Sequence, residues 1–393
     1  MPTRPRLLIL SFSPIRHDAR VLKQVRMAVG RYHVTTCGFG EAPDGVDDHV
    51  QIDHSSLPGK TWDLLLATKA YRAGYWLIPD VRTARRALRG RRFDVILADD
   101  IDTVPLAIPL KPRCGIHADL HEYFPRLAED HAPWKKRIGP WYHWLCRVHL
   151  PKVTSVTTVS EGIAREYSEQ FGIEVGVVTN ATPFHDLEPG SVDDPIRVVH
   201  SGTSHRERNI TAIVEGVLSV PGYTLDLYLT PNDPPHLAEL KQLAETESNL
   251  TVHDPVPYEQ LIETLNRYDI GAFLLPASNF SFANALPNKV FDFIQARLAL
   301  VVSPIPEMAK VVRDAEVGVV TDGVGAEELA RALSELDREK VAVLKASSHA
   351  HARELSCESE VPKWDAALTK ILRGAGVAAP EALEPPANGP GNG

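Results

Sequence analysis

A loop at residues 202–209, GTSHRERN, carries residue types that suit an anionic ligand. It combines Gly202 with the guanidinium groups of Arg206 and Arg208, and guanidinium groups bind phosphate oxygens in pairs. A predicted helix over 210–218 follows directly, and the N-terminus of a helix attracts negative charge. The pattern predicts a diphosphate site, with a solvated basic turn as the alternative.

A second loop, LPNK at residues 286–289, opens another candidate site. Its Lys289 can neutralise phosphate. Apolar residues recur at helical spacing over 290–298, and the β-branched stretch 299–303 predicts a buried parallel strand. Asp292 is expected in the first helical turn, where a carboxylate suits the positive end of the helix dipole. Such loops face the ligand crevice at the carboxyl edge of a sheet.

His121 is the third candidate. It follows a predicted strand in the segment 115–124, GIHADLHEYF, and Asp119 and Glu122 flank it. A neutral imidazole can donate or accept a hydrogen bond at a ligand hydroxyl. The alternative is a histidine with a structural role only.

The chain opens with the strand, loop, helix and strand order of a Rossmann-like domain. The strands are predicted at 7–12 and 33–39, and the helix at 19–29 with Asp18 as its N-cap. No G-x-G-x-x-G fingerprint accompanies them, so no tightly held NAD or FAD is expected. Four polar residues of the connecting segment are candidates for contact with an acceptor or phosphate: Arg16, His17, Asp18 and Arg20. A further helix is predicted over 61–88.

Composition bounds the class of protein. The chain has 393 residues, which suits two domains of about 180 residues each. A hydrophobic content of 44% and a charged content of 24% are typical of a globular protein. The net charge of −9 argues against broad nucleic-acid binding. No apolar run reaches the length of a membrane-spanning helix, and the cysteine spacing fits a reducing cytoplasm.

The order of these segments resembles glycosyltransferase family 4, whose members have the GT-B fold and retain the configuration of the transferred sugar. A bacterial variant of that family reads LPNK-x-F followed by Glu or Asp, as residues 286–292 do here. The family's paired glutamates fall on Asn284 and Asp292, and its glycine falls on Arg297. Its cleft histidine falls on His121.

The resemblance also covers the basic loop, where the family grips the donor diphosphate with a glycine, an arginine and a lysine. Gly202 matches the glycine, Arg208 falls on the lysine, and Thr203 replaces the arginine, with Arg206 close by. The resemblance implies a nucleotide-diphosphate sugar as donor, most often UDP- or GDP-linked, with no cofactor and no metal. For the acidic residues Asp99 and Asp100 we therefore expect capping of the next helix and lining of a cleft.

The predicted fold class is α/β, a GT-B fold with two Rossmann-like domains facing across a cleft. We expect an acceptor-side domain at residues 1–183, a linker at 184–195 and a nucleotide-sugar domain at 196–350. A helix at 351–373 should cross back to the first domain, and a disordered tail should follow at 374–393.

Trp134 to Arg147, WKKRIGPWYHWLCR, combines basic and aromatic residues. Such segments can rest on a membrane interface, where many members of the family act on lipid-linked acceptors. The alternative is an aromatic helix packed on its own domain with lysines in solvent. We expect a cytoplasmic protein, with this segment as a candidate for peripheral contact with the inner face of the membrane.

The resulting hypothesis is a retaining, metal-independent glycosyltransferase that moves a sugar onto a cell-envelope glycan or glycolipid. In it His121 and Asp292 are the catalytic candidates, and the donor is bound by Gly202, Arg206, Arg208, Asn284 and Lys289. The losses of family charge at Asn284 and Thr203 favour an alternative, a non-catalytic partner or regulator on the same fold. A sugar-nucleotide epimerase on this fold is the third hypothesis.

Overall fold

The computed structural model describes residues 4–55 and 59–384 and divides them into two compact units. Over these residues the first unit spans 4–179, 279–281 and 360–384. The second spans 180–278 and 282–359. The sequence-predicted tail is described only as far as residue 384, and its remainder lies outside the described residues.

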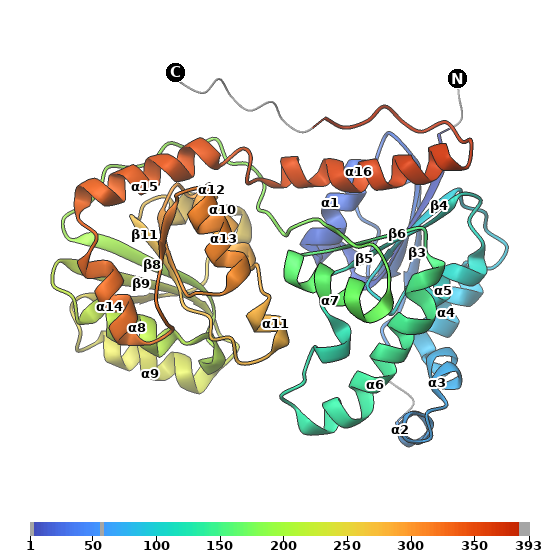
Figure 1. Cartoon of the computed structure of the whole chain (residues 1–393), viewed down its shortest axis with the longest axis horizontal. Helices are drawn as coiled ribbons and strands as arrows, with labels where there is room; N and C mark the ends of the chain where they lie inside the picture. Colours follow the sequence, from blue (N-terminus) through green and yellow to red (C-terminus); the bar gives the residue numbers. More distant parts are fainter. Residues whose placement is uncertain (1–3, 56–58, 385–393) are drawn as a thin grey trace. The chain divides into compact units, whose positions relative to one another are not determined.

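The first unit is built on a parallel sheet (Figure 1). Within the described residues it has seven strands, in the order β3-β2-β1-β4-β5-β6-β7. Their bounds are β1 (Arg6–Pro14), β2 (His33–Phe39), β3 (Asp48–Ile52), β4 (Val95–Asp99), β5 (Gly115–Leu120), β6 (Ser155–Thr158) and β7 (Gly176–Val177). The apolar run of β1 is buried throughout, because helices cover both faces of a parallel sheet.

Alternate residues of β1 enter different cores, as the pleat of a strand requires. Leu7 and Ile9 pack with the helices α1 (Ala19–Ala28) and α16 (Cys357–Gly374). Leu8 and Leu10 pack with the helices on the other face. Those helices include α4 (Pro79–Ala87), α6 (Ala132–His149) and α7 (Glu161–Phe171), together with α2 (Lys60–Ala67), α3 (Tyr71–Leu77) and α5 (Val104–Ala107).

The prediction of one helix over 61–88 is wrong, because the segment forms the three helices α2, α3 and α4. Lys69 takes a left-handed backbone conformation with φ of 59°, which ends α2. Pro79 begins α4, where its missing N–H costs nothing. The prediction of Asp18 as an N-cap is confirmed, since its carboxylate accepts the backbone N–H groups of Arg20 and Val21.

The second unit also has a parallel sheet, with six strands in its described residues in the order β10-β9-β8-β11-β12-β13. Their bounds are β8 (Ile196–Thr203), β9 (Tyr223–Thr230), β10 (Leu250–His253), β11 (Ile270–Phe273), β12 (Ala299–Val302) and β13 (Gly318–Val320). Its helices are α8 (Ile210–Leu218), α9 (Pro234–Ala244), α10 (Tyr258–Leu265), α12 (Asn288–Gln295), α13 (Pro306–Asp314), α14 (Ala326–Ser334) and α15 (Arg338–His351). The short helix α11 (Phe280–Ala283) lies in the loop between β11 and α12.

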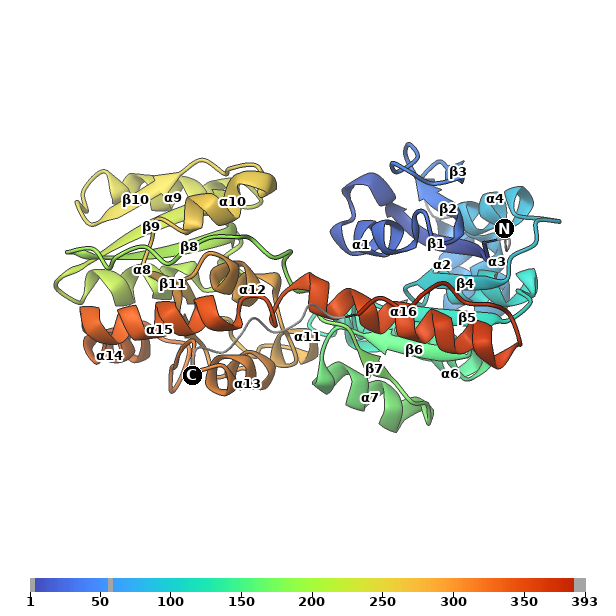
Figure 2. The same cartoon turned by 90° about the horizontal axis from the view of Figure 1, so that it is seen from above.

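The C-terminal helix α16 runs along the helix α1 in both views (Figures 1 and 2). Its Trp364 and Leu368 are buried in the core that also contains Val21 and Val25. The following segment stays attached to the same unit, since the N–H of Leu383 donates to Asp365 at 2.8 Å. Of the helices in the described part of the chain, none is long and apolar enough to span a membrane.

A buried ion pair joins α15 to the sheet of the second unit. The ammonium group of Lys345 donates to Asp269 at 2.9 Å and to the carbonyl of Tyr268 at 2.8 Å. The other carboxylate oxygen of Asp269 accepts the backbone N–H of Arg197 at 3.0 Å, where β8 begins. The pair therefore holds one helix and two strand entrances together.

Replacing Lys345 by Met leaves the buried carboxylate of Asp269 without its cation. We expect Lys345→Met to lower the free energy of unfolding of this unit by about 3 to 5 kcal/mol. Urea unfolding followed by far-UV circular dichroism measures the loss. Lys340→Met, at an exposed position of the same helix, should change it by less than about 0.5 kcal/mol. Equal effects of the two variants would contradict the role given to the pair.

Candidate functional site

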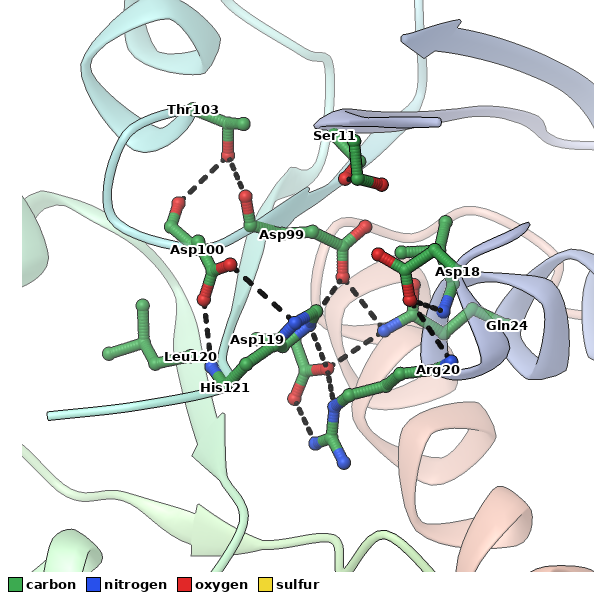
Figure 3. A network of polar contacts seen from close by, with 12 residues as sticks. Ser11, Asp18, Arg20, Gln24, Asp99, Asp100, Thr103, Asp119, Leu120 and His121 are labelled. Carbon is green, nitrogen blue, oxygen red and sulfur yellow. Dashed lines mark hydrogen bonds and ion pairs between the residues drawn. The ribbon is translucent and has the colours of Figure 1, made fainter. Parts of the chain in front are cut away.

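His121 directly follows β5 and lies among three carboxyl groups (Figure 3). Its backbone N–H donates to Asp100 at 2.8 Å. Its ring nitrogens lie 3.4 Å from an oxygen of Asp99 and 3.5 Å from oxygens of Asp100 and Asp119. The side chain keeps 19% exposure, and its Nε2 atom is buried.

The carboxyl groups decide the charge of this histidine. Burial by itself opposes protonation, but the carboxylate of Asp100, followed by those of Asp119 and Asp99, raises the pKa of His121 well above its ordinary value. The three carboxyl groups therefore favour the protonated imidazolium form of the ring. The sequence-based expectation was a neutral imidazole. It did not allow for Asp99 and Asp100, which only the fold brings to His121.

Arg20 holds Asp119 from the side of α1. Its guanidinium donates to both carboxylate oxygens, at 2.7 and 2.8 Å, and to the carbonyl of Val178 at 2.9 Å. Gln24 and Thr157 also donate to this carboxylate. Burial opposes ionisation of Asp119, yet the charge of Arg20 keeps the pKa of Asp119 well below its usual range. Arg20 was predicted as a contact for an acceptor or phosphate. It is buried, and its guanidinium binds Asp119 and Val178 inside the domain instead.

Asp99 and Asp100 do not cap the following helix, contrary to the sequence-based expectation. Their side chains turn toward His121 instead (Figure 3). Burial raises the pKa of Asp99 to about 7, against the opposing effect of its contacts with His121. Burial also raises the pKa of Asp100. The imidazolium beside them stabilises the ionised form of both acids.

Asp99, Asp119 and His121 offer three atoms within 4.8 Å of one another, a spacing that suits a metal ion. Both oxygens of Asp119, however, accept from the guanidinium of Arg20. A second cation there would compete with Arg20 and with the protonated ring of His121. The arrangement fits an ion-pair network better than a metal centre.

In the second unit, the basic residues gather where β8 ends. A Cβ atom placed on Gly202 would lie 3.8 Å from Cε of Lys289 and 3.8 Å from Nε2 of His200. Burial lowers the pKa of His200 to about 4, and the charges of Lys289 and Arg208 add to this. The neutral ring of His200 thus lies beside two cations from separate loops.

The two arginines of the loop point differently. The guanidinium of Arg208 stacks over the ring of Phe282, with 4.9 Å between its central carbon and the ring centroid. Arg206 is exposed and forms an ion pair with Glu239 of α9 at 2.5 Å. Lys289 therefore lies beside Gly202, and the charge of Arg208 acts on His200 at the same strand end, while Arg206 is paired with an acid. Asn284 directly follows α11 and is half-buried.

Asp292 is fully buried in α12. Its carboxylate accepts the hydroxyl of Thr182 at 2.6 Å and the ammonium of Lys289 at 3.1 Å. The expectation that it lies in the first helical turn is wrong, because α12 begins at Asn288 and no acid occupies that turn. Asp292 therefore pairs with Lys289, which lies about one turn before it on the same helix.

Arg297 occupies the position of the family's glycine, and its backbone is left-handed with φ of 61°. Glycine adopts this conformation without a steric cost. Here the guanidinium offsets the cost by donating to the carbonyls of Ile294, Gln295 and His185. Burial lowers the pKa of Arg297 to about 10, and the group still carries its charge at neutral pH.

The helix α6 contains the basic and aromatic segment 134–147. Trp141 is buried, and its ring contacts Trp62 of α2 at 5.5 Å between centroids. Tyr142 is half-buried and stacks on Trp134 at 6.1 Å. The exposed positions carry the cations of this segment instead: Lys135, Lys136, Arg137 and Arg147.

Sequence reasoning did not find several residues on which these sites depend. Thr182, which bonds Asp292, lies 110 positions away from it in the chain. His200 and Phe282 gave no signal by residue type alone. One signal was available for His200, since it lies in the predicted strand directly before the basic loop, where side chains reach the carboxyl edge of a sheet.

Similar folds occur among solved structures. Sucrose-phosphate synthase from Thermosynechococcus elongatus superposes with a TM-score of 0.70 at 12% identity and covers 94% of this chain and 100% of its own. HepE from Anabaena, in complex with UDP, gives 0.68 at 13% identity, with 93% and 100% covered. A glycosyltransferase from Rickettsia africae gives 0.66 at 12% identity, with 94% and 99% covered.

The fold is GT-B. Two parallel-sheet Rossmann-like units, together with these whole-length superpositions, establish this predicted fold class. No protein-family profile matches the sequence, and no curated protein matches it. The identities of 12–13% carry the comparison no further than the fold.

The charge of His121 can be tested by titration. The raised pKa of His121 means that its proton stabilises the fold fully below the ordinary value of about 6.5, and that this stabilisation is lost as pH rises through the folded-state pKa. Replacing Asp100 by Asn removes the largest opposite charge and should lower the pKa of His121, so that the loss begins at a lower pH.

Nuclear magnetic resonance of labelled imidazole carbons measures this directly. We expect His121 to stay protonated at pH 7.5 in the wild type, and its midpoint to fall in Asp100→Asn. Asp44→Asn, at an exposed acid that pairs with Arg16, serves as the control and should leave it unchanged. A wild-type midpoint near the ordinary histidine value of about 6.5 would contradict the assignment.

Proposed function

We propose that this protein is a glycosyltransferase of family 4 that transfers a sugar from a nucleotide-diphosphate sugar. The observation that carries the proposal is the convergence of Gly202, Arg208 and Lys289 at the carboxyl end of β8 in a GT-B fold. Ligands of open α/β sheets bind at this edge. Two fixed cations beside a glycine suit the diphosphate of such a donor.

In this proposal the cations act on the leaving group. Cleavage of the bond between sugar and phosphate leaves negative charge on the departing nucleoside diphosphate. Arg208 and Lys289 stabilise that charge at fixed positions, which lowers the barrier without a metal ion. Retention of the sugar's configuration follows the resemblance to family 4.

Asp292 has a positioning role in the proposed mechanism. Its carboxylate is buried and already accepts from Thr182 and Lys289, so it orients the ammonium group of Lys289 toward the diphosphate. Arg206 contributes less than Arg208, because Glu239 balances its charge. Asn284 supplies an amide where the family has a carboxylate, and we assign it to the donor sugar or ribose.

His121 is proposed to contact the transferred sugar. As an imidazolium it donates hydrogen bonds and does not accept them, so a sugar hydroxyl oxygen is the partner that fits it. We propose UDP or GDP as the nucleotide, and UDP is what HepE from Anabaena binds in its solved complexes. The acceptor is a cell-envelope glycan or a lipid-linked glycan.

Release of nucleoside diphosphate tests the proposal. Purified protein is incubated with UDP-, GDP-, dTDP- and ADP-sugars, and mass spectrometry follows the products. We expect one nucleotide to be released, and Arg208→Ala and Lys289→Ala to reduce the rate by about 10²- to 10³-fold. Arg206→Ala, in the same loop but paired with Glu239, is the matched control and should reduce it less than tenfold.

Binding separates a missing acceptor from a missing activity. A thermal shift with one nucleotide that is lost in Arg208→Ala, without turnover, supports the donor site and indicates that an acceptor is required. Neither turnover nor a thermal shift with any nucleotide would favour the non-catalytic partner on the same fold.

A basic face of the first unit supports the proposed peripheral contact with a membrane. Three adjoining hollows around Trp144 are lined by Lys69, Arg72, Lys136, Arg137, Arg147 and Lys152, and no acidic residue of the described chain lines them. The widest has a volume of about 870 Å³. On a chain with a net charge of −9, this face suits an anionic lipid surface.

Vesicle sedimentation tests the contact. We expect the protein to bind vesicles with 30% phosphatidylglycerol and not vesicles of phosphatidylcholine alone. Reversing two charges in Lys136→Glu/Arg137→Glu should weaken binding by about tenfold or more, since each cation contributes about 1 kcal/mol at such a surface. Lys310→Glu/Arg313→Glu on α13 of the other unit is the control. Equal binding of all three proteins would contradict the proposal.

A further inference from the structure

A pocket of about 270 Å³ lies within the first unit and shares Tyr75 with one hollow of the basic face. Most of its lining is aromatic or aliphatic. The lining residues are Phe12, Phe39, His54, Trp62, Tyr75, Ile78, Asp80, Val81, Asp102, Leu127, Trp134, Ile138, Trp141 and Tyr142. Its volume is near the lower end for small-molecule sites, which suits a group of the size of a ring.

The spacing of residues in α6 explains one wall. Trp134, Ile138, Trp141 and Tyr142 recur at intervals of three and four, so they share one face of the helix. This face turns inward, so that Trp134, Trp141 and Tyr142 line the pocket. The opposite wall comes from the ends of β1 and β2, where Phe12 and Phe39 stack at 6.4 Å.

The pocket contains acids but no lysine or arginine among its described lining residues. Asp80 is held by the loop after β3, since it accepts the N–H of Ser55 at 3.0 Å and contacts His54. Asp102 accepts the hydroxyl of Tyr142 at 3.2 Å and remains half-buried. It lies two positions after Asp100, so the polar end of the pocket adjoins the network around His121.

We propose that this pocket binds a compact apolar group of the sugar acceptor, with Asp102 as the hydrogen-bonding partner of a polar substituent on that group. The inference rests on the proposed glycosyl transfer, because it names the class of acceptor. The acceptor is then an amphipathic molecule, and a free sugar would lack the part that fills the pocket. Ring-lined walls favour a flat group, because aromatic rings stack or meet edge to face.

Asp102 can form a hydrogen bond with such a polar substituent on either side of neutral pH. Burial and the nearby Asp100 raise the pKa of Asp102 to about 7, against the effect of the Tyr142 hydroxyl. The carboxyl group therefore donates or accepts a hydrogen bond as the ligand requires.

Binding of simple glycosides to the whole protein tests this inference. Isothermal titration compares methyl, hexyl and p-nitrophenyl glycosides of glucose, mannose, galactose and N-acetylglucosamine. We expect an apolar tail to tighten binding of at least one sugar by about tenfold to a hundredfold over its methyl glycoside. A gain for p-nitrophenyl alone identifies an aromatic group, and an equal gain for hexyl identifies an alkyl chain.

A matched pair of variants locates the binding. Leu127 lines the pocket and is 36% exposed, so Leu127→Trp fills the rim without disturbing the core. It should abolish the gain from the apolar tail. Leu64→Trp makes the same substitution at a leucine that is 63% exposed and lies outside the pocket, and it should leave the gain intact.

Two results would overturn the inference. One is equal binding of methyl and apolar glycosides for every sugar, and the other is a gain that survives in Leu127→Trp. The nucleotide thermal shift, measured on the same samples, reports on the proposed donor site separately. A lost nucleotide shift with an intact glycoside gain would reject glycosyl transfer and keep the pocket.

Discussion

The buried ion pair of Arg20 and Asp119 is the constraint on which the polar centre of the first unit depends. A buried carboxylate is costly unless it is paired, and Arg20 pairs both of its oxygens. With Asp119 ionised, His121 retains a proton, and the proton in turn compensates Asp99 and Asp100. Asp100 contributes most to holding this proton, and Asp119, which Arg20 keeps ionised, adds to the effect.

The second unit follows the same logic with different residues. Asp292 is buried behind Lys289 and fixes the position of that cation. Asp269 is buried behind Lys345 and fixes the strand entrances. At the carboxyl edges of the two sheets, buried acids hold the cations Arg20 and Lys289. The pair of Asp269 and Lys345 lies at the opposite edge, where β8 and β11 begin.

The sequence allowed the strands and helices to be predicted well, but the protonation states of the site residues could not be predicted from it. Continuous apolar runs identify strands such as 33–39, which matches β2, and helical spacing identifies α8 at 210–218. The break at Lys69 and the start of α12 at Asn288 depend on single backbone conformations, which periodicity does not encode. The position of His121 after a strand was evident, but its protonation depends on the nearby Asp119 together with Asp99 and Asp100 from the end of another strand. Likewise, composition gave no means to decide which face of the segment 134–147 turns inward.

The left-handed backbone at Arg297 has a consequence for recognising related chains. The conformation that a glycine would supply is present, but a side chain stabilises it by bonding the last carbonyls of α12. A motif that requires glycine at this position would pass over this chain, although its backbone has the left-handed conformation that glycine adopts readily. The backbone angle at this position is therefore a better criterion for comparing such loops than the residue type.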